Sequence, residues 1–465
     1  MRKRSLHGML PVALAIAAIA GCGGTPGEDK PNEQAEGTPA EQVKTEGFED
    51  LGPVTLTVIS AEGSGGPQDA LKALSRSFEE KYPNVTVKIS FRDFAGWTKQ
   101  AKLVASSDKA PDVFAGNQGY QLDGELVKAG LIVPLDEYAK AYGWDQSYTP
   151  ETMQQFQWTD DGKTFGEGTL WAVAQTGQSV GVFANKKKLD AAGVDPASLK
   201  TFDDFDAALA KLRDSLPADD PVIVLGDLDQ YHALHVWGGI QGAYVPAQDV
   251  RDWIFQRDGA TFDTEGNLTA LQKLKDWADK GYFGKADAYN SRNETNAGVV
   301  FSKGQGALLI AGNWQAATAR DGLGDDAIFF NMPPGESGDM VNIGSTSFPM
   351  HISAKTKQPD LAAAYLDWIT GPDAAQELVD TQQVPAAIDA TAEPGDPLGQ
   401  QVKEGWDQLV ESGGLTLYPD WSSPTMLQTM GQTFQEMLAG RISPQDVISR
   451  VQDDWEKYHQ QLAGG

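Results

Sequence analysis

Residues 54–59 read VTLTVI, residues 71–82 read LKALSRSFEEKY and residues 85–91 read VTVKISF. In the first and third segments, apolar side chains alternate with polar ones, which is typical of a half-buried β-strand. In the middle segment, apolar residues recur every three or four positions, which predicts an amphipathic helix that ends before Pro83. A strand, a helix and a second strand within about 40 residues indicate a parallel sheet covered by helices.

The same alternation continues along the chain. A helix is predicted at 97–106 and a strand at 111–115, which completes a β-α-β-α-β order and an α/β fold. Further strands are predicted at 171–174, 181–184, 222–225 and 307–311, and further helices at 202–212, at 268–278, after Pro359 and after the Ser443-Pro444 cap. No fixed-period repeat occurs, which argues against a solenoid or a propeller.

Length and charge exclude several classes of protein. The 465 residues favour two or three domains, and 40% hydrophobic residues are too many for a disordered chain. There are 37 Lys and Arg against 65 Asp and Glu, for a net charge of −28. Nucleic-acid binding is therefore not expected, because it depends on clustered basic residues.

The N-terminus has the layout of a secretory signal. Arg2, Lys3 and Arg4 precede an apolar run at 9–20, and Ile19-Ala20-Gly21-Cys22 resembles the bacterial lipobox. This resemblance implies a lipoprotein signal peptide at 1–21, cleavage before Cys22 and a diacylglycerol on its sulfur. The alternative is an ordinary signal peptide with an accidental cysteine.

The segment after the signal peptide is poor in large apolar residues. Residues 22–52 are rich in Gly, Pro, Glu and Thr, which predicts a disordered acidic tether. Cys22 is the only cysteine, so a disulfide scaffold, a cysteine nucleophile and a thiolate metal site are excluded. Beyond the N-terminus, no apolar run reaches the length of a membrane span.

Five sequence blocks carry a resemblance to a known family. They are residues 71–87 (LKALSRSFEEKYPNVTV), 110–114 with 126–136 (APDVF, LVKAGLIVPLD), 182–205 (VFANKKKLDAAGVDPASLKTFDDF), 301–307 with 312–314 (FSKGQGA, GNW), and 332–335 with 344–345 and 352–356 (MPPG, GS, ISAKT). In this order they resemble the extracellular solute-binding proteins of ABC transporters, in the carbohydrate-binding type 1 group. The third block departs from the family pattern at Phe183-Ala184 and at Phe202.

The resemblance implies a two-lobed, type II periplasmic-binding-protein-like α/β fold. The implied segments are 53–173 plus 330–370 for lobe 1 and 174–329 plus 371–465 for lobe 2, with hinge crossings near 172–176, 328–333 and 370–374. The ligand is expected between the lobes, which close around it. The implied partners are a mono- or oligosaccharide and the permease subunits of an ABC importer. A monomer without a cofactor is expected.

Sugar chemistry selects the candidate aromatic residues. Sugar rings have apolar C–H faces, so a binding site needs aromatic side chains that stack on them. The candidates are Trp97, Trp237, Trp314 and Trp421. Trp314 is the first choice, because the family often stacks sugar at this position. The remaining tryptophans at helical spacing, Trp253, Trp277, Trp368 and Trp455, are assigned to cores.

Sugar hydroxyls need polar partners, which are expected where strands end. The polar candidates are Glu62, Asn117, Gln118, Gln175, Thr176, Gln178, Tyr231, His232, Gly344 and Ser345. The alternative role of Glu62 is to complement the positive end of a helix. Asp112 is expected to be structural, because it precedes the core residues of a strand.

Some of the same residues also suggest enzymatic alternatives. Residues 177–181 match G-x-S-x-G, but a nucleophile elbow needs a helix directly after Ser179, where a strand is predicted. A glycosidase needs two carboxylates about 5–9.5 Å apart, which counting acidic residues cannot exclude. The alternating oxygens at 263–267 lack the length of an EF-hand and are expected to cap a helix, so no metal is predicted.

The sequence predicts a lipoprotein anchored through Cys22 to the outer face of a bacterial cytoplasmic membrane, or a periplasmic protein. It captures a sugar or oligosaccharide and delivers it to an ABC permease, without covalent chemistry. The alternatives are a carbohydrate-active enzyme and a surface sugar sensor or adhesin without transport.

Overall fold

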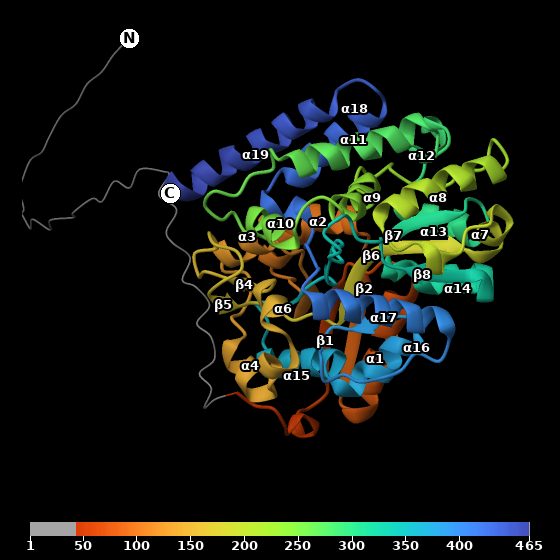
Figure 1. The fold of residues 1–465 in the computed structure, drawn as a ribbon. Coiled ribbons are helices and arrows are strands. Elements are labelled where there is room, and N and C mark those ends of the chain that lie inside the picture. Colours follow the sequence, from red (N-terminus) through yellow and green to blue (C-terminus); the bar gives the residue numbers. More distant parts are fainter. Residues whose placement is uncertain (1–42, 465) are drawn as a thin grey trace, which may run out of the picture. The chain divides into compact units, whose positions relative to one another are not determined.

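The computed structural model describes residues 43–464, in which two main β-sheets are flanked by helices and a third sheet has only the two strands β4 and β5 (Figure 1). The first sheet has the strand order β10-β3-β1-β2. Its strands are β1 (Val54–Ser60), β2 (Val85–Phe91), β3 (Val113–Ala115) and β10 (Met350–Ile352). β1 pairs in parallel with β2 and with β3, and β10 runs antiparallel to β3.

Helices α1 (Gly65–Lys81) and α2 (Phe94–Ser106) connect the three parallel strands, which confirms the predicted β-α-β-α-β order. Leu71, Leu74 and Phe78 form the buried face of α1, as the helical spacing predicts. Asp112, directly before β3, accepts hydrogen bonds from the hydroxyls of Thr57 and Thr356. This confirms the structural role expected for Asp112.

The second sheet is built around β6 (Thr176–Asn185), a ten-residue strand that is buried along its whole length. Its antiparallel partners are β7 (Leu308–Gly312), β8 (Ala327–Phe330), β9 (Gly344–Thr346) and β11 (Val384–Pro385). Ser179 lies inside β6 and is fully buried. The G-x-S-x-G stretch is therefore a central strand and not a nucleophile elbow.

The remaining elements surround these sheets. Between β3 and β6 lie α3 (Asp123–Lys128), α4 (Asp136–Tyr142), α5 (Trp144–Ser147), α6 (Pro150–Gln154), β4 (Gln157–Trp158) and β5 (Thr169–Leu170). Between β6 and β9 lie α7 (Lys186–Ala192), η3 (Pro196–Ser198), α8 (Phe202–Ser215), α9 (His232–Gln241), α10 (Ala247–Ile254), α11 (Glu265–Asp279), α12 (Ala286–Tyr289), α13 (Glu294–Ser302), η4 (Asn313–Gln315), α14 (Ala316–Leu323) and η5 (Gly324–Asp326). After β10 lie α15 (Pro359–Thr370), η6 (Pro372–Ala374), α16 (Ala375–Asp380), α17 (Pro397–Ser412), η7 (Pro419–Ser422), α18 (Met426–Leu438) and α19 (Pro444–Gly464).

Two predicted strands are wrong. Residues 171–174 and 222–225 are buried, but each segment forms only one isolated bridge, Val173 with Met350 and Ile223 with Leu308. A short apolar run shows that a segment is buried and does not establish that it pairs along its length. The two predicted helix caps are confirmed, because Thr264 accepts from the backbone of Asn267 and Ser443 accepts from the backbone of Asp446.

The described residues begin at 43, before the predicted end of the tether at residue 52. Phe48, in η2 (Phe48–Asp50), is buried against Tyr82, with ring centroids 5.9 Å apart. The signal peptide and Cys22 lie outside the described residues. β9 also pairs with β6, although its range was assigned to the lobe of the first sheet. Within residues 43–464, no helix has the length and apolar character needed to cross a membrane.

Candidate functional site

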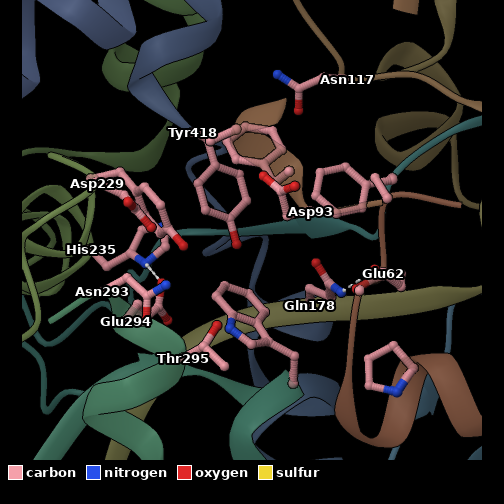
Figure 2. Close-up of a pocket in the computed structure, with 18 of the residues that line it drawn as sticks. Glu62, Asp93, Asn117, Gln178, Asp229, His235, Asn293, Glu294, Thr295 and Tyr418 are labelled. Carbon is pink, nitrogen blue, oxygen red and sulfur yellow. Dashed lines mark hydrogen bonds and ion pairs between the residues drawn. The ribbon is translucent and has the colours of Figure 1, made fainter. Parts of the chain in front are cut away.

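A cavity of about 540 Å³ lies between segments of the two sheets. This volume is within the range of small-molecule sites, about 300–1,000 Å³. One wall comes from loops after β1, β2 and β3, and the other from the starts of α9 and α13, from η4 and from η7. Figure 2 shows that side chains of both walls point into this space.

The first wall follows from the parallel strands. Glu62 comes after β1, Asp93 after β2, and Asn117 and Gln118 after β3, so they meet at the carboxyl edge of the sheet. The Gln118 side-chain amide donates hydrogen bonds of 3.0 Å to the Thr346 hydroxyl and to the backbone carbonyl that follows Thr346. This wall is therefore tied to the residues at the end of β9.

The opposite wall combines a charged pair with aromatic rings. Glu294 is the first residue of α13, and its Oε2 lies 3.3 Å from His235 Nδ1 on α9. The rings of Trp314, Tyr231 and Tyr418 lie with their centroids 5.5–5.6 Å from the His235 ring. Figure 2 places Glu294, His235 and Asp229 on one side of the cavity and Glu62 with Gln178 on the other.

The structure brings eight of the predicted site residues to the cavity lining. They are Glu62, Asn117, Gln118, Gln178, Tyr231, Trp314, Ser345 and Trp421. Trp421 is only 3% exposed, because it also packs on the backbone beside Gly119. Gly119 has φ of +88°, and a Cβ there would lie 2.4 Å from Trp421, so this close approach requires glycine.

Two predicted aromatic residues lie in the core instead of the cavity. Trp97 is 2% exposed, and its indole donates to the backbone carbonyl of Ala115. Trp237 is fully buried. The glycines beside Trp237 serve close helix packing, because a Cβ at Gly238 would clash with Ile343. Small neighbours therefore reflect helix packing here and not access to a ligand.

The predicted polar residues His232, Gln175, Thr176 and Gly344 also lie outside the cavity lining. His232 accepts from the backbone of Gly226 and donates to the carbonyl of Ile310, so both ring nitrogens are satisfied in the core. The Gln175 amide donates to the carbonyl of Ile369. Thr176 and Gly344 are buried in paired strands.

Sequence reasoning missed much of the lining. The missed residues include Asp93, Phe94, Asp229, His235, Asn293, Glu294, Phe348, Tyr418 and Asp420. Asp93 directly follows the second predicted strand region, so the strand-end argument used for Glu62 could have found it. The missed residues of the second wall lie on loops and helix starts that no local pattern brings together.

Burial acts to raise the pKa values of three carboxyl groups in the cavity lining. Burial raises the pKa of Glu62 to about 7, although Gln178 Nε2 donates to its Oε1 over 3.4 Å. Burial raises the pKa of Asp420 to about 6 against the opposing effect of His235. Burial also acts to raise the pKa of Glu294, but His235 and further hydrogen bonding hold that pKa below its ordinary value.

The Glu62→Gln variant is expected to have a stability that depends less on pH. The pKa of Glu62 in the folded protein, about 7, is above its ordinary value of 4.5, so the folded state binds more protons between these values. The stability due to Glu62 is present below pH 4.5 and is lost as the pH rises through 7. The free energy of unfolding of the variant, measured relative to that of the wild type, should rise by on the order of 2 kcal/mol between pH 5 and pH 8.

Denaturant unfolding at both pH values measures this difference. Glu80→Gln, on the exposed face of α1, is the matched control and should follow the wild-type pH profile. Identical pH profiles for Glu62→Gln and wild type would contradict the assignment of this titration to Glu62.

The arrangement suits reversible binding by stacking and hydrogen bonds. Within the part of the chain that the structure describes, no group of three or more His, Cys, Asp or Glu residues is placed to hold a metal ion. The Asn117 amide nitrogen and the Tyr418 hydroxyl are buried and have no hydrogen-bond partner among the described residues. Unpaired buried donors of this kind are costly unless a ligand or water satisfies them.

Comparison with known proteins places the chain in a family. Residues 60–376 match the family model of the bacterial extracellular solute-binding proteins. The chain is 24% identical over 407 residues to an uncharacterised ABC transporter extracellular-binding protein of Pyrococcus horikoshii, covering 85% of this chain and 83% of that protein. It is 25% identical over 373 residues to the diacetylchitobiose-binding protein of Streptomyces coelicolor, covering 78% of this chain and 77% of that protein.

The fold is shared with solved structures. A chitin oligosaccharide-binding protein matches with a TM-score of 0.73 and 20% identity, over 87% of this chain and 99% of that protein. This likeness confirms the two-lobed α/β fold. Because the family match also spans more than half of the sequence, the chain belongs to the bacterial extracellular solute-binding protein family.

Proposed function

We propose that this protein is the substrate-binding component of an ABC importer and that it captures a sugar or oligosaccharide in the cavity between the two sheets. The observation that carries the proposal is the combination of aromatic rings with carboxylate and amide groups around one enclosed space. The relatives named for binding diacetylchitobiose and chitin oligosaccharides support a carbohydrate ligand.

The lining matches the two surfaces of a sugar. Trp314 and Tyr231 offer ring faces for the apolar C–H patches of a pyranose. Glu62 and Gln178 offer hydrogen-bond acceptors and donors. Asn117 offers its amide nitrogen and Tyr418 its hydroxyl, which have no hydrogen-bond partner among the described residues. A sugar hydroxyl can both donate and accept, so it can satisfy either kind of group.

Binding is proposed to draw the two lobes together, since the ligand would contact groups attached to both sheets. A ligand shifts only the equilibria whose two states it distinguishes, and contacts to both walls exist only when the lobes are close. The closed form is then the state that the permease recognises. In this proposal the protein acts as a monomer, without catalysis, on the outer face of the membrane, through a lipid on Cys22.

A panel of mono- and oligosaccharides tests the proposal by thermal shift and calorimetry. We expect at least one sugar to raise the unfolding temperature, because ligand at about 100 times Kd stabilises the native state by roughly 2.7 kcal/mol. An affinity near micromolar, about 8 kcal/mol, is ordinary for reversible capture. The same samples, analysed by chromatography, would show hydrolysis products if the protein were a glycosidase. The absence of any thermal shift across the panel would contradict sugar binding.

A further inference from the structure

The cavity lining is rich in negative charge. Its carboxylates are Glu62, Asp93, Asp229, Glu294 and Asp420, and Arg92 supplies the only guanidinium among the lining residues, with no lysine. Four of these carboxylates, all except Asp420, are labelled in Figure 2, where they surround the space from both walls. Carboxyl groups therefore line both walls, and Arg92 lies next to Asp93 on the first of them.

These carboxylates are poorly compensated within the described residues. Among residues 43–464 none of them forms an ion pair with a lysine or an arginine. Glu294 pairs with His235, and Asp93 accepts a hydrogen bond from the Gly96 backbone as the N-cap of α2. The second oxygen of Glu294, Oε1, is buried without a hydrogen-bond partner in a side chain that is 2% exposed. Asp420 is 7% exposed and forms no ion pair within the described part of the chain, although the charge of His235 acts to lower its pKa.

Asp229 lies near two other carboxylates, Asp93 and Glu294. Burial raises the pKa of Asp229, and the negative charges of Asp93 and Glu294 raise it further, against a hydrogen bond from Asn293 and the weaker opposing charge of Lys99. Asp93 comes from the first wall, so closing the cavity brings like charges together. Enclosing unpaired carboxylates is costly unless a positive charge accompanies them.

A neutral sugar supplies hydrogen bonds and no charge, whereas a protonated amine supplies both. The rings of Tyr231, Trp314 and Tyr418 around the His235–Glu294 pair also suit a cation, because the faces of aromatic rings attract positive charge. Charge-assisted hydrogen bonds to carboxylates are about twice as strong as neutral ones.

Building on the function proposed above, we propose that the preferred ligand is an amino sugar, or an oligosaccharide that contains one, with its protonated amine between Asp229, Glu294 and the facing Asp93. The sugar ring then lies against Trp314. The three carboxylates, which would repel one another when charged, become the partners of the amine.

Calorimetry with matched ligands tests this proposal. The probes are glucosamine with glucose, galactosamine with galactose, and a β-1,4-linked glucosamine disaccharide with its diacetylated form and cellobiose. For each sugar that binds, we expect the amine form to bind about tenfold tighter than the hydroxyl or acetamide form. This factor is the size of one charge-assisted hydrogen bond. This preference should shrink as salt is added, since charges at the exposed rim are screened.

The Asp229→Asn variant should lose most of the amine preference, because it should weaken binding of the amine form more than binding of the neutral form. Asp229 is exposed, so this change is expected to leave the fold intact. Asp108→Asn, at an exposed position outside the cavity lining, is the matched control and should retain the preference.

The outcomes separate this inference from the proposed function. Neutral sugars that bind as tightly as their amine forms would overturn the inference and leave sugar binding in place. Spermidine, a polyamine without a sugar ring, is the further probe. If it bound and no sugar did, the inference and the proposed function would both be overturned, because the cavity would then select charge alone. No binding of any probe would also contradict both.

Discussion

The Trp314→Ala variant is expected to bind sugar with an affinity lowered by more than about 1 kcal/mol, while its fold is retained. Trp314 lies in η4, directly after β7, and it is half-buried at the cavity beside His235. An aromatic ring that stacks on a sugar contributes both its buried area and the specific geometry of the ring face. Calorimetry with the best sugar of the panel measures the loss, and circular dichroism confirms the fold.

Two variants separate stacking from a general effect of losing an indole. Trp314→Phe retains a ring and should recover part of the affinity. Trp368→Ala removes a half-buried indole from α15, outside the cavity lining, and should reduce stability without changing sugar affinity. Unchanged affinity in Trp314→Ala would remove Trp314 from the proposed binding site.

The Trp237→Ala variant is expected to lose stability instead of sugar affinity, with a free energy of unfolding lowered by about 3–5 kcal/mol. Trp237 is fully buried on α9, and its ring packs at 5.6 Å from Phe262 and 5.5 Å from Phe434. Truncation removes buried apolar surface and leaves a cavity that the surrounding helices can fill only in part. Guanidinium unfolding measures the loss.

Trp237→Phe is the matched control, and it should cost much less. A phenyl ring fills part of the space, and it also removes the indole nitrogen, which is buried without a hydrogen-bond partner among the described residues. Sugar affinity should stay near the wild-type value in the folded fraction of both variants. A large loss of affinity in Trp237→Phe with unchanged stability would return Trp237 to the binding site.

The two tryptophans show where reasoning from the sequence stopped. Trp314 and Trp237 both lie beside glycines, and both were candidates for sugar stacking. Gly312 and Asn313 end a strand at the cavity, whereas Gly238 and Gly239 allow α9 to approach Ile343 and Met332. A glycine near an aromatic residue can therefore mark either a strand end at a cavity or a close helix contact, and only its packing partner distinguishes the two.

The strand-end argument worked for the first wall and for Trp314, and it failed for most of the second wall. Glu62, Asn117 and Gln118 follow parallel strands, whose carboxyl ends share one edge of the sheet, so their meeting could be predicted. His235 and Glu294 lie 59 positions apart on separate helix starts, and Tyr418 is more distant still. No periodicity links these positions, so their approach could not be predicted.

Local patterns were enough to establish the α/β class, the parallel strands of the first sheet and the main amphipathic helices. These features depend on the spacing of apolar side chains among near neighbours, which the order of residues records directly. The antiparallel sheet around β6, the second wall and its unpaired carboxylates depend on contacts between segments far apart in the chain. Long-range packing decides which polar groups face the cavity, because only the folded chain determines which side chains find partners and which stay free for a ligand.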